Sequence, residues 1–112
     1  MDSKTIPEEL TIPVRWEQSA QQETIWKFPV SLVGHQTIEV PCDAVPLCVQ
    51  VQHEVVCIWY RVSPDAPAQF RSIYIHETGH DLSPNARKYI GTFQIRGGRL
   101  VFHVFEGMDA SK

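Results

Sequence analysis

Residues 76–80 read His-Glu-Thr-Gly-His, which matches the sequence signature of zinc peptidases. In that signature one helix places two histidines four residues apart on the same face, where both bind Zn²⁺. The glutamate between them activates the metal-bound water. The first hypothesis for chemistry is therefore a metal-dependent hydrolase acting through His76, Glu77 and His80.

The sequence around the motif argues against this hypothesis. The preceding segment, Phe70–Ile75, is rich in β-branched and aromatic residues and alternates between apolar and polar positions from Arg71 to Tyr74, which favours a strand. Gly79 inside the motif and Pro84 shortly after it would end a helix. No third ligand follows at the usual spacings. We interpret the match as the coincidence of a short motif, and we expect no metal, no cofactor and no enzymatic activity.

Length and composition bound the class of protein. A chain of 112 residues with 43% apolar residues suits one domain with a single modest core. No apolar stretch approaches the roughly 18 residues of a membrane span, and the polar N-terminus does not resemble a signal peptide. The three cysteines form no CxxC pair, which argues against a disulfide scaffold or a zinc ribbon. A reducing, cytoplasmic setting is expected.

The net charge of −3 is unevenly distributed along the chain. Residues 1–23 carry five acids and two bases, whereas residues 24–112 carry eight of each. No basic stripe is present that could neutralise phosphates, so nucleic-acid binding is not expected.

Residues 1–23 are predicted to form an arm that precedes the domain. The arm combines prolines and glutamines with four apolar residues that alternate along the chain, Leu10, Ile12, Val14 and Trp16. We expect the arm to be dispensable for folding and to influence partner choice, either by pairing with a sheet edge or by covering a neighbouring subunit. A passive tail is the alternative.

From Thr24 onward short apolar or alternating runs are separated by turn residues, which predicts an all-β domain over residues 24–106 with a C-terminal tail, 107–112. About seven strands would form a small antiparallel β-sandwich or a partly open barrel. Residues 76–88 are expected to be irregular, with room for one helical turn over 81–87 capped by Ser83. The predicted strands are Thr24–Leu32, Gln36–Val40, Leu47–Gln52, Val55–Val62, Phe70–Ile75, Tyr89–Arg96 and Arg99–Glu106.

Two hairpins allow the strand register to be predicted. Gly97-Gly98 suits a two-residue turn of the primed type, whose central residues need positive φ. That turn would give a core face with the pairs Ile95–Leu100, Phe93–Phe102 and Gly91–Val104, and a mixed face with Gln94–Val101, Thr92–His103 and Ile90–Phe105. A tight turn at His53-Glu54 would pair Val51–Val56, Val49–Ile58 and Leu47–Tyr60, although a longer loop is an open alternative.

The order of several segments resembles a family of short, uncharacterised proteins that is widespread in tailed phages and prophages. The resemblance covers about residues 24–106 and implies a phage origin, but it implies no activity. The family tends to have a Gly-containing turn where this chain has His53-Glu54, and His76 and Glu77 lie outside its shared Thr-Gly-His. The segments that carry the resemblance are Thr24–Phe28, Gln36–Pro41, Val49–Gln52, Cys57–Trp59, Thr78–His80, Tyr89–Gln94 and Leu100–Glu106.

Six residues are candidates for binding a partner or ligand: Trp16, His80, Arg87, Arg96, Arg99 and His103. His80 follows a glycine in a loop, where it could bind a ligand or cap the turn. His103 lies in mid-strand, where a structural role is the ordinary case. Arg96 and Arg99 face each other at a hairpin tip, so they either splay into solvent or meet an acidic partner.

The preferred hypothesis for function is a non-enzymatic interaction protein of a phage or prophage. Such a protein would bind and modulate a host protein in the bacterial cytoplasm, for instance by inhibiting a host defence, and it could form a homo-oligomer. A second hypothesis is a sponge for a nucleotide signal, with a pocket between subunits lined by His80, Arg87 and aromatic residues. The metal-dependent hydrolase is third.

Overall fold

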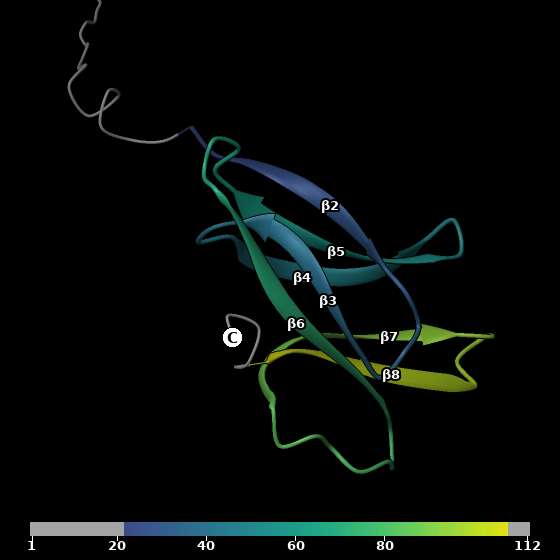
Figure 1. Cartoon of the computed structure of the whole chain (residues 1–112). Helices are drawn as coiled ribbons and strands as arrows, with labels where there is room; N and C mark the ends of the chain where they lie inside the picture. The colour runs from purple at the N-terminus through teal and green to yellow at the C-terminus, as the bar shows by residue number, and fades with distance from the viewer. Residues whose placement is uncertain (1–21, 108–112) are drawn as a thin grey trace, which may run out of the picture.

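The computed structural model describes residues 22–107, which form seven β-strands and contain no helix (Figure 1). No helix of this described part could therefore cross a membrane. The all-β class predicted from the sequence is confirmed, whereas Leu10, Ile12, Val14 and Trp16 of the predicted arm lie outside the described residues. The strands are β2 (Thr24–Val30), β3 (His35–Pro41), β4 (Val45–Gln52), β5 (Val55–Val62), β6 (Ala68–Glu77), β7 (Ala86–Ile95) and β8 (Leu100–Gly107).

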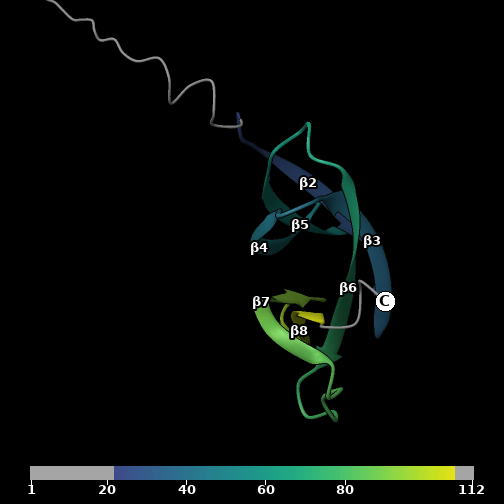
Figure 2. The same ribbon diagram turned by 60° about the vertical axis from the view of Figure 1, so that its left-hand side comes forward.

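The strands build two antiparallel sheets. One sheet has the order β2-β5-β4 and the other has the order β3-β6-β8-β7. At one side of the molecule β4 lies against β7, so the two sheets meet there without forming one continuous sheet (Figure 2). At the other side no ladder joins β2 to β3. The domain is thus a two-sheet sandwich and not a closed barrel.

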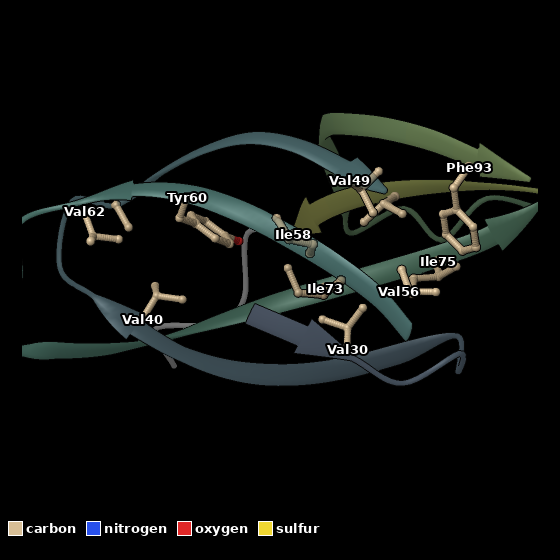
Figure 3. Close-up of a cluster of buried hydrophobic side chains, with 12 residues drawn as sticks. Val30, Val40, Val49, Val56, Ile58, Tyr60, Val62, Ile73, Ile75 and Phe93 are labelled. Carbon is tan, nitrogen blue, oxygen red and sulfur yellow. The ribbon is translucent and has the colours of Figure 1, made fainter. Parts of the chain in front are cut away.

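The core lies between the sheets and follows from the alternation of each strand. In β5 the alternate residues Ile58, Tyr60 and Val62 are buried, and Ile73 faces them from β6 (Figure 3). Val104 of β8 belongs to the same buried cluster. The predicted core face of the last hairpin is confirmed, since Phe93 and Val104 are buried and Phe102 packs against the core from a partly buried position. This apolar contact between layers is what each sheet needs to be stable.

Both predicted tight turns are present. The Arg99 N–H donates to the Arg96 carbonyl oxygen at 3.2 Å across Gly97 and Gly98, whose φ angles are 65° and 89°. In the β4–β5 turn His53 and Glu54 both have positive φ, 52° and 68°, and Gln52 faces Val55. The longer loop considered for this hairpin is therefore excluded. The primed turn forms although neither of its residues is glycine.

Two predicted pairs are wrong because each hairpin contains an irregularity. Tyr60 faces Pro46 instead of Leu47, and Phe105 faces Tyr89 instead of Ile90. In each case one strand carries an extra residue, as in a β-bulge, and the register shifts by one from that point on. The registers nearer to the turns, including Thr92 opposite His103, agree with the prediction.

The connection between β6 and β7 is shorter than expected and contains no helical turn. It covers residues 78–85, because β6 continues to Glu77 and β7 begins at Ala86. Ser83 organises a turn here: its Oγ accepts the Asn85 N–H at 3.1 Å, and its carbonyl accepts the Ala86 N–H at 3.0 Å. A hydrogen bond of this kind from a side chain to the backbone competes with helix formation, which explains why residues 81–87 do not form the predicted helical turn.

The contact between β4 and β7 gives the first prediction. A Cβ added at Gly91 would lie 2.8 Å from Val49 Cγ1, a stiff β-branched side chain in the core. We expect Gly91→Ala to lower the unfolding free energy by about 1–3 kcal/mol, which corresponds to a fall in melting temperature of about 4–8 °C per kcal/mol. Thermal melting measures this effect.

Gly34→Ala is the matched control, because nothing lies within 4 Å of its added Cβ. An equal loss of stability in both variants would contradict close packing of β4 on β7.

Candidate functional site

The His76–His80 motif lies on a strand end and a turn. His76 and Glu77 close β6, Gly79 has a φ of 92°, and His80 follows with its side chain 69% exposed. The His80 Nε2 atom lies 3.7 Å from Glu77 Oε1. The prediction of a strand instead of a helix before the motif is confirmed, and the two histidines are not presented on one helical face.

The His76 ring belongs to a row of stacked rings on the outer face of the four-stranded sheet. Its Nε2 accepts the Ser83 backbone N–H at 3.3 Å, so that nitrogen is occupied. The ring lies parallel to Tyr74 at 6.4 Å, and Tyr74 stacks on His35 at 4.5 Å. Within the described residues no three His, Cys, Asp or Glu side chains are grouped so that they could hold a metal ion. These contacts hold the connection 78–85 against the sheet.

His103 is fixed at both of its ring nitrogens. Its Nδ1 lies 2.9 Å from Thr92 Oγ1 and its Nε2 lies 2.6 Å from Thr78 Oγ1. The Tyr89 hydroxyl lies 2.6 Å from Thr92 Oγ1, and Thr78 Oγ1 donates to the Val101 carbonyl at 3.4 Å. A neutral ring that carries its proton on Nε2 satisfies the whole chain: Tyr89 donates to Thr92, Thr92 to His103 and His103 to Thr78.

This arrangement leaves His103 no free nitrogen for a metal or for proton transfer. The sequence placed His103 opposite Thr92, but it did not show that Thr78, the residue that follows β6, approaches from the other side. The geometry assigns His103 to the structure of the outer face.

A charged cluster is buried between the sheets. Arg71 Nη1 donates to Glu106 Oε2 at 2.7 Å, and the Tyr60 hydroxyl donates to the same oxygen at 2.8 Å. Arg71 Nη2 also donates to the Ala44 carbonyl oxygen at 3.0 Å. The Arg71 and Glu106 side chains are only 16% and 9% exposed. The sequence contains a signal for this cluster. Arg71 and Glu106 are charged residues at positions where the alternation of apolar and polar residues along their strands predicts side chains that face the core.

The pKa of the Tyr60 phenol is raised above its ordinary value of 10.0. Burial is the largest cause, followed by the negative charge of Glu106 and by the hydrogen bond to it; Arg71 acts in the opposite direction. Tyr60 is therefore a fixed hydrogen-bond donor that ties the three-stranded sheet to Glu106 of the other sheet. No reacting group could reach it, since Tyr60 is 0% exposed.

A concave surface lies at the end of the sandwich that carries the β4–β5 turn, the β7–β8 turn and the end of β2. It is an open groove of about 1050 Å³, which we call the hairpin groove. Three of its apolar side chains are substantially exposed, namely Leu32 at 46%, Val51 at 36% and Val55 at 43%. The complete lining is Val30, Leu32, Val51, Glu54, Val55, Val56 and residues 94–98.

The rim of the hairpin groove is charged. Glu54 stands on one hairpin, and Arg96 stands on the other beside Arg99. Among the described residues neither arginine has a carboxylate within ion-pair distance. Within the described residues, no carboxylate therefore offsets the repulsion that is expected between Arg96 and Arg99 at this hairpin tip.

The other sequence-derived candidates are not brought together. His80 contacts Glu77, and no hydrogen bond or ion pair within residues 22–107 joins it to Arg87. Arg87 is exposed at the start of β7, and Trp16 lies outside the described residues. Of the predicted set, only Arg96 lines the hairpin groove. Sequence reasoning missed Leu32, Val51 and Val55, which belong to different strands or loops; their one signal is that each lies next to a turn.

The geometry of the motif gives the second prediction. After dialysis against zinc and removal of unbound metal, we expect the protein to hold less than about a tenth of an equivalent. The physical reason is that His76 Nε2 is bonded to Ser83, whereas His80 projects from a turn. Elemental analysis of wild type and His80→Ala measures this; one equivalent in wild type that is lost in His80→Ala would contradict it.

The raised pKa of Tyr60 gives the third prediction. The unfolded chain releases this proton near pH 10.0, but the folded protein retains it. The stabilisation is therefore complete below about pH 10 and is lost as the pH rises above that value. We expect the melting temperature to fall with alkaline pH more steeply in wild type than in Tyr60→Phe.

The exposed tyrosine provides the control for this experiment. Tyr89→Phe, at a position 57% exposed, is expected to follow the wild-type curve. Parallel curves for wild type and Tyr60→Phe would show that the Tyr60 pKa is not raised.

The chain was compared with protein families, with curated proteins and with solved structures. Neither the curated proteins nor the solved structures contain a match to this chain. Residues 21–112 match the family described as "Domain of unknown function (DUF7352)". The match covers most of the chain and all seven strands described above. The chain therefore belongs to the DUF7352 family.

Proposed function

We propose that this chain is a non-catalytic interaction module that binds a partner protein in the hairpin groove. The observation that carries the proposal is the concave apolar surface on which Leu32, Val51 and Val55 are exposed together. Apolar side chains gathered in a concavity and rimmed by charges are typical of a binding surface. The outer-face histidines support a non-catalytic function, because both ring nitrogens of His103 and the Nε2 of His76 are engaged in structural hydrogen bonds.

The resemblance of residues 24–106 to proteins of tailed phages suggests the nature of the partner. Following that resemblance, we take the partner to be a bacterial host protein whose activity is changed by binding, for instance one that takes part in defence. The groove is open, and residues of the β4–β5 and β7–β8 turns contribute to its lining. Its volume of about 1050 Å³ lies just above the range of about 300–1000 Å³ that is usual for small-molecule pockets, which favours a polypeptide segment over a nucleotide signal.

The fourth prediction tests the hairpin groove as the binding surface. Val55→Asp places a carboxylate in the groove at a position that is already 43% exposed, so the fold is expected to survive. In pull-downs from a bacterial host lysate, we expect this variant to recover the stoichiometric partner of the wild-type protein at least tenfold less well, a difference of about 1.4 kcal/mol.

Phe70→Asp is the matched control, because Phe70 is 56% exposed and does not line the groove. Equal recovery by wild type and Val55→Asp, with unchanged melting, would place binding elsewhere. Calorimetric titration with nucleotides tests the small-molecule hypothesis, and saturable binding that Val55→Asp abolishes would favour that hypothesis over the present one.

A further inference from the structure

Three parts of the described surface make no contact with a complementary group within residues 22–107. The hairpin groove exposes apolar side chains, Arg96 and Arg99 carry unneutralised charges beside it, and β2 is an edge strand. Within residues 22–107, β2 pairs only with β5, so the backbone groups on its other side have no strand partner. A sheet edge of this kind accepts an extended segment readily.

The edge of β2 leads directly to the hairpin groove. β2 begins at Thr24, close to the point where residues 1–21 join the domain, and ends at Val30, which lines the groove. Near the joining point Glu23 Oε1 accepts a hydrogen bond from Arg61 Nε at 3.0 Å, in an ion pair at the surface. A segment that follows this edge back from Gln22 therefore arrives at the groove.

The chain itself contains a segment of complementary chemistry. Residues 8–14 read Glu-Glu-Leu-Thr-Ile-Pro-Val, in which two acids precede alternating apolar residues. The apolar residues suit a groove lined by Leu32, Val51 and Val55, and the acids suit the Arg96–Arg99 tip. The whole net charge of −3 lies in residues 1–23, whereas residues 24–112 are neutral.

The length of the chain decides which residues of the arm could reach the hairpin groove. Gln22 and Val30 are eight residues apart, which is about 26 Å of strand at about 3.3 Å per residue. Trp16 is six residues before Gln22 and extends at most about 22 Å, so it falls short of the groove. Val14 is eight residues before Gln22 and just reaches Val30, and Ile12 and Leu10 reach beyond it.

We propose that residues 8–14 occupy the hairpin groove of their own chain. They follow the free edge of β2 and place Ile12 and Leu10 in the groove and Glu8 and Glu9 opposite Arg96 and Arg99. A tethered segment is present at an effective concentration of the order of millimolar, which favours the same chain over a second copy. An external partner must then displace residues 8–14; this consequence rests on the proposed function, whereas the occupancy does not.

The fifth prediction tests the occupancy in the full chain. In amide ¹H–¹⁵N spectra, we expect Ile12→Asp to shift the signals of Gly97, Gly98 and Val55, because they surround the groove. Trp16→Ser is the matched control. It removes a larger apolar side chain from the same arm, at a position that lies too near to the start of the domain to reach the groove. The signals of Ile58 and Ile73 in the core report that both variants are folded.

A charge exchange tests the proposed orientation. Glu8→Arg with Glu9→Arg is expected to shift the same groove signals, and the addition of Arg96→Glu with Arg99→Glu is expected to restore them. No shift with Ile12→Asp, or equal shifts with Trp16→Ser, would overturn the proposal. A wild-type groove spectrum that changes with protein concentration would also overturn it, because the occupant would then be a second copy.

The two proposals can fail separately. Loss of the partner with Val55→Asp, combined with a groove spectrum that is insensitive to Ile12→Asp, would retain the binding surface and reject its internal occupant. A groove spectrum that responds to Ile12→Asp, combined with undiminished partner recovery by Val55→Asp, would retain the occupant and reject the binding surface.

Discussion

The arrangement of the two sheets depends on one buried carboxylate. Glu106 of β8 accepts hydrogen bonds from Arg71 on the neighbouring strand β6 and from Tyr60 on the opposing sheet. Burial of an ion pair alone contributes little net stability, because desolvation offsets the attraction. Its effect here is on specificity: a slip of one residue would turn Glu106 to the outer face and leave Arg71 and Tyr60 unpaired inside. The cluster therefore supports one register and one pairing of sheets.

The same cluster makes the two ends of the sandwich different. At its end of the molecule Arg71 also bonds to the Ala44 carbonyl, so the connection between β3 and β4 is held across the opening. At the opposite end of β5 the chain turns at His53 and Glu54, and the connection that crosses between the sheets there is residues 31–34, which joins β2 to β3. Leu32 of this connection is exposed, as are Val51 and Val55 beside the turn, and these side chains line the hairpin groove.

The sequence predicted what depends on neighbouring residues and missed what depends on distant ones. Seven strands, both tight turns and the registers beside them follow from alternation and turn chemistry. The pairs Leu47–Tyr60 and Ile90–Phe105 failed because an inserted residue leaves the alternation of the strand almost unchanged in sequence.

The candidate site shows the same division. Arg96 was predicted because it stands beside a turn that is visible in the sequence. Leu32, Val51 and Val55 became visible as a group only when β2, β4 and β5 were placed together. For His103 the partner in the adjacent hairpin strand was predicted, whereas Thr78, 25 residues away along the chain, was not.

The backbone at the groove provides a further physical argument for its importance. Within the described residues four non-glycine residues have positive φ, and three of them, His53, Glu54 and Arg96, lie in the two turns that bound the groove. This conformation costs about 1–2 kcal/mol for a residue with a side chain, and glycine would avoid the cost. Glu54 and Arg96 nevertheless project charged side chains at the groove rim. Backbone strain of this kind gathers at functional sites, which is in keeping with the proposal that the groove binds a partner.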